Sequence, residues 1–461
     1  MENKKNNNNL LLPVYGSKWD IRPEPDNKIP QNSMRSDEAY QMIYDEMNLQ
    51  GNANLNLATF VTTWMEPAAE KLMTLGSRYN LIDEDEYPRL KTIEDRVIKM
   101  EAELFNAPKT VKPTGVTTVG SSEAIILGLL AHKWTWRKKR QEADLDYYKP
   151  NIIFGADVHT CWEKFARYFD VEIKIIPMKP GKYTIDADDV KPLLDENTIA
   201  VGAIVGTTFT GQVDDVKSIN DMLIQYEKET GRYIPIHVDA ASGGFVLPFI
   251  MPEFEWDFRL EHVRSINVSN HKFGLVYAGM GSLIFKDHSD LPQELPFEIN
   301  YLGGTMSNYS LNFSKSSSNL LAQYYNFLRY GKDGYHHIVN AVMQNAHYLE
   351  KRLVESGYFE ILTDTKFLPI VVVKLKNEYT FTAYDLSMSL KEFGWIIPAY
   401  SLPKNSEKIV VLRMVVKENF THTFAQKLLT DIDKTIKYLM REPVEIKKDV
   451  KVSITKPHGV C

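Results

Sequence analysis

Short apolar runs separated by turn residues recur through the middle of the chain, from about residue 56 onward. Runs of this length, bounded by turn residues, are typical of buried parallel strands. We expect such strands at residues 151–155, 172–176, 203–206, 234–238, 265–268 and 282–285. Helical stretches lie between several of them, notably at residues 122–141, 161–169 and 215–230. This alternation predicts an α/β sheet with helices on both faces.

The two ends of the chain have a different pattern. Residues 1 to about 35 are polar and include the run Asn6–Asn9, which we interpret as low-complexity sequence. An acidic helix is expected at residues 36–48. Beyond about residue 340, helices and apolar strands indicate a smaller α+β domain, with elements at 338–355, 368–375, 410–416 and 424–440. We therefore expect an N-terminal arm with a short helix (1–55), a large domain (56–340), a small C-terminal domain (341–445) and a tail (446–461).

Composition narrows the class of protein. The chain has 461 residues and a formal net charge of −6, which counts against nucleic acids and anionic membranes as its main partners. Its two cysteines, Cys161 and Cys461, can form neither a disulfide framework nor a zinc-type cysteine pairing. No run approaches the ~18 apolar residues of a membrane helix. We expect a cytoplasmic protein with no metal site.

Two strand ends carry candidate chemistry. Asp239 ends one apolar strand and is followed by small residues and two glycines, while Lys272 follows the next strand beside His271. The carboxyl ends of parallel strands are where α/β folds bind ligands. A lysine there can form a Schiff base, and an aspartate in the same crevice can pair with a protonated pyridine nitrogen.

A third segment, Gly120-Ser121-Ser122, opens a helix, and exposed N–H groups at a helix start suit a phosphate. Each segment alone has a more ordinary interpretation: a turn-capping Asp239, a surface Lys272, and a common helix cap. Together, in the order phosphate cup, aspartate and lysine, the three ordinary interpretations become improbable.

Seven stretches between about Asp37 and Met440 match one family in the same order: residues 51–60, 82–88, 120–124, 161–168, 237–245, 271–274 and 293–304. The chain resembles the glutamate decarboxylase branch of the pyridoxal-phosphate group II decarboxylases. The resemblance implies a fold-type I enzyme, with a large, mostly parallel sheet domain and a smaller C-terminal α+β domain. It also implies pyridoxal 5'-phosphate as cofactor and decarboxylation of L-glutamate to 4-aminobutyrate and CO2.

The resemblance assigns roles around the cofactor ring. Lys272 resembles the Schiff-base lysine, and Asp239 resembles the partner of the ring nitrogen. Ala241 resembles the residue under the ring. Thr208, in the run Gly206 to Gly211, resembles a residue near the ring, on the side of its hydroxyl.

The phosphate group has its own set of residues in the family. Ser121, Ser122 and His271 resemble its ligands, with Ser314 reaching in from a second subunit. The resemblance therefore implies a homo-oligomer in which the active site is shared.

The substrate pocket is implied by other positions. Thr59, Phe60 and Asp83 match residues that bound the pocket for the distal carboxylate. Arg413 matches a candidate anchor for a substrate carboxylate, with a buried structural salt bridge as an equally good interpretation. Tyr301 matches a loop position near the active site, for which packing is the alternative.

One position departs from the glutamate branch. That branch usually carries glutamine on the ring face of the cofactor, whereas this chain has His159, as aromatic amino-acid decarboxylases do. Glutamate remains the expected substrate because the flanking residues follow the glutamate branch. A decarboxylase of an aromatic amino acid and a catalytically silent scaffold stay as alternatives.

The C-terminal tail offers two regulatory hypotheses. His458 could gate the site as pH rises, because histidine titrates in that range, although an ordinary tail histidine is the preferred interpretation. Residues 440–461 contain lysines but no tryptophan and no clear basic amphipathic helix. Calmodulin binding is therefore not expected.

Overall fold

The computed structural model describes residues 27–299, 306–376 and 379–441. The chain divides into two compact units between Leu55 and Asn56. The first contains α1 (Ser36–Asn48) and the short helix η2 (Ala53–Leu55). Two acidic side chains lie in the first turn of α1, where their negative charges interact favourably with the positive end of the helix dipole. The helix predicted at residues 36–48 is confirmed.

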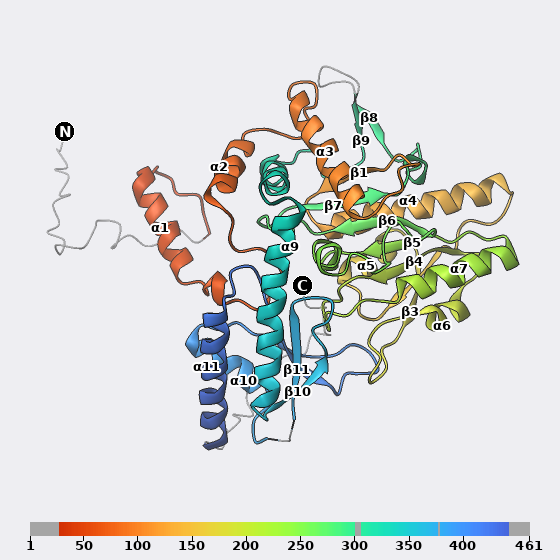
Figure 1. Cartoon of the computed structure of the whole chain (residues 1–461). Coiled ribbons are helices and arrows are strands. Elements are labelled where there is room, and N and C mark those ends of the chain that lie inside the picture. Colours follow the sequence, from red (N-terminus) through yellow and green to blue (C-terminus); the bar gives the residue numbers. More distant parts are fainter. Residues whose placement is uncertain (1–26, 300–305, 377–378, 442–461) are drawn as a thin grey trace, which may run out of the picture. The chain divides into compact units, whose positions relative to one another are not determined.

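The second unit is built on a seven-stranded sheet (Figure 1). Its strands follow the order β1 (Thr114–Thr118), β7 (Gly281–Phe285), β6 (Val263–Val268), β5 (Ile236–Asp239), β4 (Thr198–Ile204), β2 (Asn151–Gly155), β3 (Glu172–Ile176). The run from β6 to β3 is parallel, and β7 is antiparallel to both of its neighbours. The predicted mostly parallel α/β sheet is confirmed.

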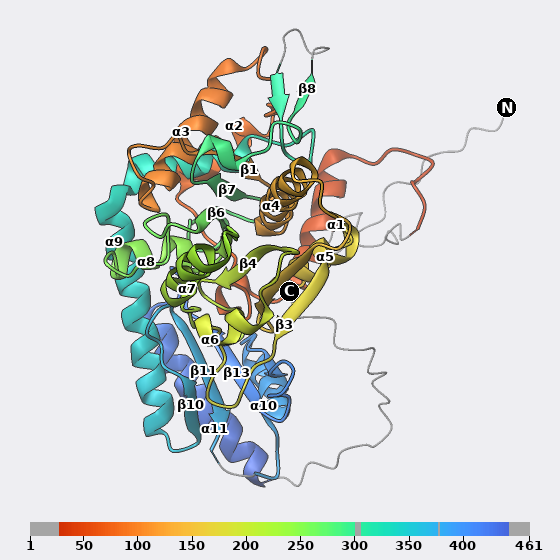
Figure 2. The same cartoon turned by 90° about the vertical axis from the view of Figure 1, so that its right-hand side faces the viewer.

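Helices cover both faces of this sheet (Figure 2). Val201 and Ala203 of β4 join the core that includes side chains of α7 (Val216–Thr230). Ala200 and Ile204 of the same strand pack with side chains of α4 (Ser121–Glu142) and α5 (Thr160–Tyr168). Alternate side chains of a strand point to opposite faces, so β4 contributes to two separate cores.

A second, antiparallel sheet has the order β10 (Phe359–Thr363), β11 (Ile370–Leu375), β13 (Val410–Val415), β12 (Ala399–Ser401). Three helices pack against it or one another: α9 (Ser318–Glu355), α10 (Ala383–Leu390) and α11 (His422–Arg441). Within α9 the backbone leaves the helical region at Gly331, so α9 consists of two helices joined at a kink.

The sequence missed several elements of this unit. They are α2 (Pro67–Gly76), α3 (Pro88–Leu104), α6 (Ala187–Val190), α8 (Leu247–Ile250), β1, β8 (Phe297–Ile299), β9 (Met306–Asn308), β10, β12, α10 and the first half of α9. In α3 and α9 the buried face carries polar Glu101, Gln323 and Asn326, which break the amphipathic pattern. No helix in the described ranges is long and apolar enough to cross a membrane.

Candidate active site

A crevice of about 250 Å³ lies where the carboxyl ends of β4 and β5 meet the first turns of α4 and α5. Its lining also includes the segment that follows β6. Eight of the predicted site residues line it: Ser121, Ser122, His159, Thr208, Asp239, Ala241, His271 and Lys272. Residues from separate strands and helices thus converge at the edge of the sheet where α/β folds bind ligands.

Asp239 is buried at the end of β5 and is held by three donors. Its Oδ2 accepts from Trp162 Nε1 at 3.1 Å, and its Oδ1 accepts from Asn267 Nδ2 at 2.9 Å and from the backbone N–H of Ala241 at 3.1 Å. A carboxylate is an acceptor on both oxygens, so three donors and no acceptor suit the ionised form. This arrangement keeps a negative charge inside the crevice.

Lys272 brings an amine into the same crevice. Its Nζ donates to Ser242 Oγ at 3.1 Å and lies 5.0 Å from the centre of the Phe60 ring. Burial lowers the pKa of Lys272, and the nearby Asp239 charge only partly opposes the effect. A lowered pKa increases the fraction of neutral amine, which is the form that attacks a carbonyl carbon.

The start of α4 provides donors for an anion. Ser121 opens the helix, and its hydroxyl lies 2.7 Å from the hydroxyl of Ser269. His271 Nδ1 accepts from the backbone N–H of Met280 at 3.3 Å, and burial lowers the pKa of His271 to about 4. The neutral ring therefore carries its proton on Nε2, which is available as a donor. With the free N–H groups of the helix start, this set suits a phosphate.

His159 caps the start of α5. Its Nδ1 accepts from the backbone N–H of Cys161 at 3.3 Å. Burial and the charge of Lys272 lower the pKa of His159 against the opposing effect of Asp239. The ring is therefore a neutral, flat group on the wall of the crevice, as a stacking role requires.

Arg413 lies beside the crevice, not in its lining. Its Nη1 donates to the Thr208 carbonyl at 2.7 Å and its Nη2 to the Ala58 carbonyl at 2.6 Å. The guanidinium carbon lies 4.8 Å from the centre of the Phe60 ring and 5.7 Å from that of Tyr400. Arg413 therefore joins β13 to Thr208 of the crevice lining and to the segment that precedes Phe60, in both cases through a carbonyl group.

Thr59 is close to this cluster, in the turn that precedes Phe60. Its Oγ1 accepts from the backbone N–H of Val61 at 3.1 Å, so the hydroxyl shapes the local chain. The segment that contains Thr59 and Phe60 is thereby placed between Arg413 and Lys272.

Asp83 and Ser314 lie together away from this crevice. Asn80 Nδ2 is 3.4 Å from Asp83 Oδ1 and 3.4 Å from Ser314 Oγ. Neither residue belongs to the crevice lining of its own chain. Tyr301, His458 and the C-terminal tail lie outside the described residues.

Three contacts in the crevice were not predicted: those of Trp162, Asn267 and Ser242. Trp162 and Asn267 bind Asp239, and Ser242 binds Lys272. Strand pairing was the available clue for Asn267, because β5 and β6 are adjacent and place it opposite Asp239. Trp162 is three residues after His159, one helical turn further along α5.

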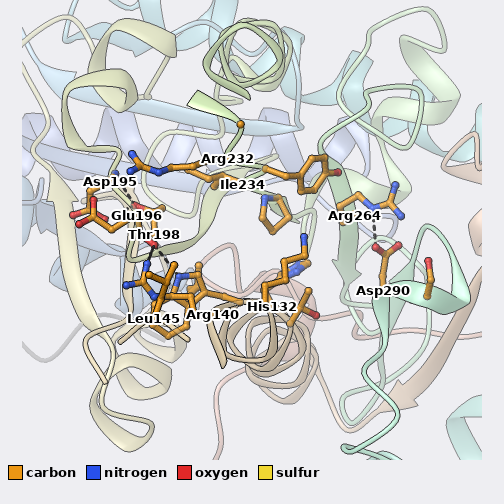
Figure 3. A pocket seen from close by; sticks show the side chains of 18 of the residues that line it. His132, Arg140, Leu145, Asp195, Glu196, Thr198, Arg232, Ile234, Arg264 and Asp290 are labelled. Atoms are coloured by element: carbon orange, nitrogen blue, oxygen red, sulfur yellow. Dashed lines mark hydrogen bonds and ion pairs between the residues drawn. The ribbon is translucent and has the colours of Figure 1, made fainter. Parts of the chain in front are cut away.

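A larger cavity of about 940 Å³ lies at the opposite edge of the sheet (Figure 3). It contains none of the predicted site residues. Its charged side chains have both signs, and Arg264 binds Asp290 there at 2.7 Å. Its lining includes Lys139 and several carboxylates, but its α4 residues come from the middle and end of that helix and not from its start.

Comparison with known proteins agrees with this constellation. Residues 30–376 match the pyridoxal-dependent decarboxylase conserved domain. The chain is 46% identical over 432 residues to glutamate decarboxylase of Solanum lycopersicum, covering 93% of this chain and 86% of the relative. It is 44% identical over 434 residues to glutamate decarboxylase of Lactococcus lactis, covering 93% of both chains.

A solved structure of Lactobacillus brevis glutamate decarboxylase superimposes with a TM-score of 0.90 at 40% identity, covering 93% of this chain and 98% of that chain. The family match spans most of the sequence and includes the strands that carry Asp239 and Lys272. The chain therefore belongs to the pyridoxal-dependent decarboxylase family.

Proposed function

We propose that this chain removes the α-carboxylate of L-glutamate, with pyridoxal phosphate as cofactor, to give 4-aminobutyrate and CO2. The observation that carries the proposal is the crevice that joins Asp239, Lys272 and the start of α4. Relatives from plants and bacteria with 44–46% identity over 93% of the chain are glutamate decarboxylases, which supports glutamate as substrate.

The chemistry of the crevice fits pyridoxal phosphate at both ends of that molecule. The helix start with Ser121, Ser122 and His271 offers donors to a phosphate. Asp239 offers an acceptor to a protonated ring nitrogen. Ala241 lines the crevice without a bulky side chain, which leaves room for a flat ring.

When bound, pyridoxal phosphate supplies a protonated ring that accepts the electrons released as the α-carboxylate leaves. The side chains prepare this step. Lys272, with its lowered pKa, would hold the cofactor through its neutral amine. Asp239 keeps the ring nitrogen protonated through its own negative charge. Lys272 is also placed to return a proton to the substrate carbon.

The substrate end is assigned to the segment of Thr59 and Phe60 together with Arg413. Phe60 contacts both Lys272 and Arg413, so this segment lies beside the reacting amine. An arginine there supplies a charge for a substrate carboxylate. We infer that Arg413 binds a carboxylate of the substrate, and that its hydrogen bonds to the carbonyls of Thr208 and Ala58 hold its side chain in place.

Asp83 and Ser314 are assigned to the active site of a second subunit. Both are joined to Asn80 and stand outside the crevice of their own chain. This placement supports a homodimer or larger homo-oligomer, in which Ser314 reaches the phosphate of its neighbour. Domain boundaries near residue 340 and a cytoplasmic location belong to the same proposal.

Release of CO2 by the purified, cofactor-loaded protein tests this function. L-glutamate is compared with L-aspartate, L-tyrosine and L-DOPA from acidic to neutral pH. We expect release from glutamate alone, and its loss in Lys272→Ala. Lys228→Ala, which removes an exposed lysine of α7 outside the crevice, is the matched control and keeps full activity.

Two other outcomes would replace the proposal. Release from an aromatic substrate would make His159 the mark of a changed pocket. No release from any substrate, with the cofactor bound, would favour a silent scaffold.

A further inference from the structure

A buried row of hydrogen bonds runs through the sheet to Asp239. His132 Nε2 lies 2.7 Å from Ser265 Oγ, and Ser265 Oγ lies 2.7 Å from His237 Nδ1. His237 Nε2 lies 2.9 Å from Asn267 Oδ1, and Asn267 Nδ2 donates to Asp239 Oδ1 at 2.9 Å. The row connects the crevice with the helix α4 that covers this face of the sheet.

Hydrogen-bond chemistry gives this row one direction. Asn267 presents its N–H₂ to the carboxylate, so its carbonyl oxygen must accept from His237 Nε2–H. A neutral imidazole has one N–H, which makes His237 Nδ1 an acceptor for the Ser265 hydroxyl. The Ser265 oxygen then accepts from His132 Nε2–H. Every donor points toward Asp239.

Burial keeps both rings in the neutral form that this direction requires. His132 and His237 are buried, and this loss of hydration lowers the pKa of His132 to about 3 and that of His237 to about 4. Charged neighbours act differently on the two rings: Arg264 further lowers the pKa of His132, while Asp239 opposes the shift of His237. Neither ring carries a second proton at neutral pH.

Strand register places the row. In the parallel pair of β5 and β6, His237 stands opposite Ser265 and Asp239 opposite Asn267. Residues two apart on a strand share a face, so all four side chains point toward α4. Gly128 of α4 leaves the space that the His237 ring fills, because a β-carbon there would lie 2.7 Å from His237 Cε1.

We propose that His132, Ser265, His237 and Asn267 are positioning residues for Asp239, a one-directional row of donors that fixes the carboxylate facing the cofactor ring. The proposal rests on the role of Asp239 in the proposed function. Removal of the Ser265 hydroxyl leaves His237 Nδ1 without its hydrogen-bond donor. The His237 ring is then held less firmly, and so is the Asn267 amide that it fixes against Asp239.

The outer end of the row reaches the second cavity of the sheet. His132 lines that cavity and is labelled in Figure 3. The first hydrogen bond of the row, between His132 and Ser265, therefore lies far from the crevice. A change at His132 or Ser265 tests the row without altering a residue of the crevice lining.

The test measures cofactor affinity and ring tautomers in the full chain. For Ser265→Ala we expect the dissociation constant of pyridoxal phosphate to rise about tenfold, the upper size of one lost hydrogen bond between neutral groups. Ser265→Thr restores the hydroxyl and most of the affinity. Nitrogen-15 NMR of histidine-labelled wild-type protein, with His237→Asn used for assignment, is expected to show His237 protonated on Nε2.

Thr198→Val is the matched control. It removes another buried hydroxyl of the sheet, which binds Asn151 at 2.9 Å outside the row. It is expected to lower thermal stability as Ser265→Ala does, with unchanged cofactor affinity. Equal affinity in wild type and Ser265→Ala would overturn the proposal, and so would a wild-type His237 protonated on Nδ1. The tautomer result remains decisive if Ser265→Ala does not fold.

Cofactor affinity and the tautomer of His237 do not depend on which amino acid is the substrate. Failure to release CO2 from glutamate would count against the proposed function and leave this measurement unchanged. An unchanged affinity in Ser265→Ala, with normal turnover of glutamate, would count against the row alone.

Discussion

Gly202 lies directly against the indole ring of Trp162: a β-carbon at position 202 would come within 2.5 Å of Trp162 Cη2. Gly202 belongs to β4, and Trp162 belongs to α5, which packs on that strand. The same indole donates to Asp239. The missing side chain of one strand residue thus sets the position of a ring that holds the carboxylate of the crevice.

Gly202→Ala is expected to displace Trp162 and weaken cofactor binding. Overpacking of a buried site costs about 1–3 kcal/mol of unfolding free energy. Loss of the indole bond to Asp239 should raise the dissociation constant of the cofactor about tenfold. Trp162→Phe separates the two effects, because it keeps most of the ring and removes the N–H. Unchanged affinity in both variants would contradict this account of Trp162.

Arg413→Lys is expected to affect both stability and substrate binding. A lysine has a single ammonium group and cannot serve the carbonyls of Thr208 and Ala58 in the planar geometry of the guanidinium. We expect unfolding free energy to fall by about 2 kcal/mol and KM for glutamate to rise at least tenfold. A fall in stability with unchanged KM would show that Arg413 only stabilises the fold through its bonds to the two carbonyl groups and does not bind substrate.

Burial of Glu101 makes stability depend on pH. Glu101 is fully buried, its Oε1 accepts from Asn270 at 2.6 Å, and burial raises its pKa to about 7 against the opposing bonds from Ser282 and Asn270. A raised pKa in the folded state favours folding below the ordinary value of 4.5, and this contribution is lost as pH rises through 7. Between pH 4.5 and pH 7, this shift lowers the contribution of Glu101 to the free energy of unfolding by about 3 kcal/mol.

Glu101→Gln keeps the acceptor for Asn270 and removes the titration. The stability of wild type relative to this variant is therefore expected to fall as pH rises from 4.5 to 7, as measured by urea unfolding. Glu94→Gln provides a control of opposite sign. Burial alone would raise the pKa of Glu94, but Lys315, Lys91 and Thr117 lower it overall, so its contribution is lost as pH falls. If the stability difference between wild type and Glu101→Gln did not change with pH, Glu101 would not be held in its protonated form in the folded protein.

Strand ends made the centre of the site predictable. Asp239 and Lys272 each follow a short apolar strand, and parallel strands bring such ends to one edge. The start of α4 could be predicted for the same reason, because small residues precede a long helix. Thus local pattern, together with one rule on sheet topology, was enough to bring Lys272, Asp239 and the start of α4 to one crevice.

Contacts between distant segments were not predictable from pattern. Trp162 meets Asp239 across 77 positions of sequence, and Arg413 meets Ala58 across 355. Buried polar residues had the same effect on the fold: Gln323 is fully buried in α9, where its hydrogen bonds replace the apolar contacts that a pattern detects. The first half of α9 was therefore missed, although the second half was found.

Ser314 provides the test of a shared active site. In its own chain it is joined to Asn80 outside the crevice, and the proposal gives it to the phosphate of the neighbouring subunit. Ser314→Asp places a negative charge against that phosphate, and Lys272→Ala removes the amine. Each variant alone should lose more than 90% of activity, since like charges at a phosphate site cost on the order of 2 kcal/mol or more.

Mixing the two inactive variants then distinguishes a shared site from a self-contained one. In a hybrid dimer with sharing, one site combines both defects, while the other combines the intact Lys272 of one chain with the intact Ser314 of its partner. Unfolding and refolding of an equal mixture should therefore restore roughly a quarter of wild-type activity, because about half the dimers are hybrids with one intact site. If each chain used its own Ser314, every site would keep a defect and activity would not return. Refolded wild type measures recovery through the procedure, and each variant refolded alone gives the background.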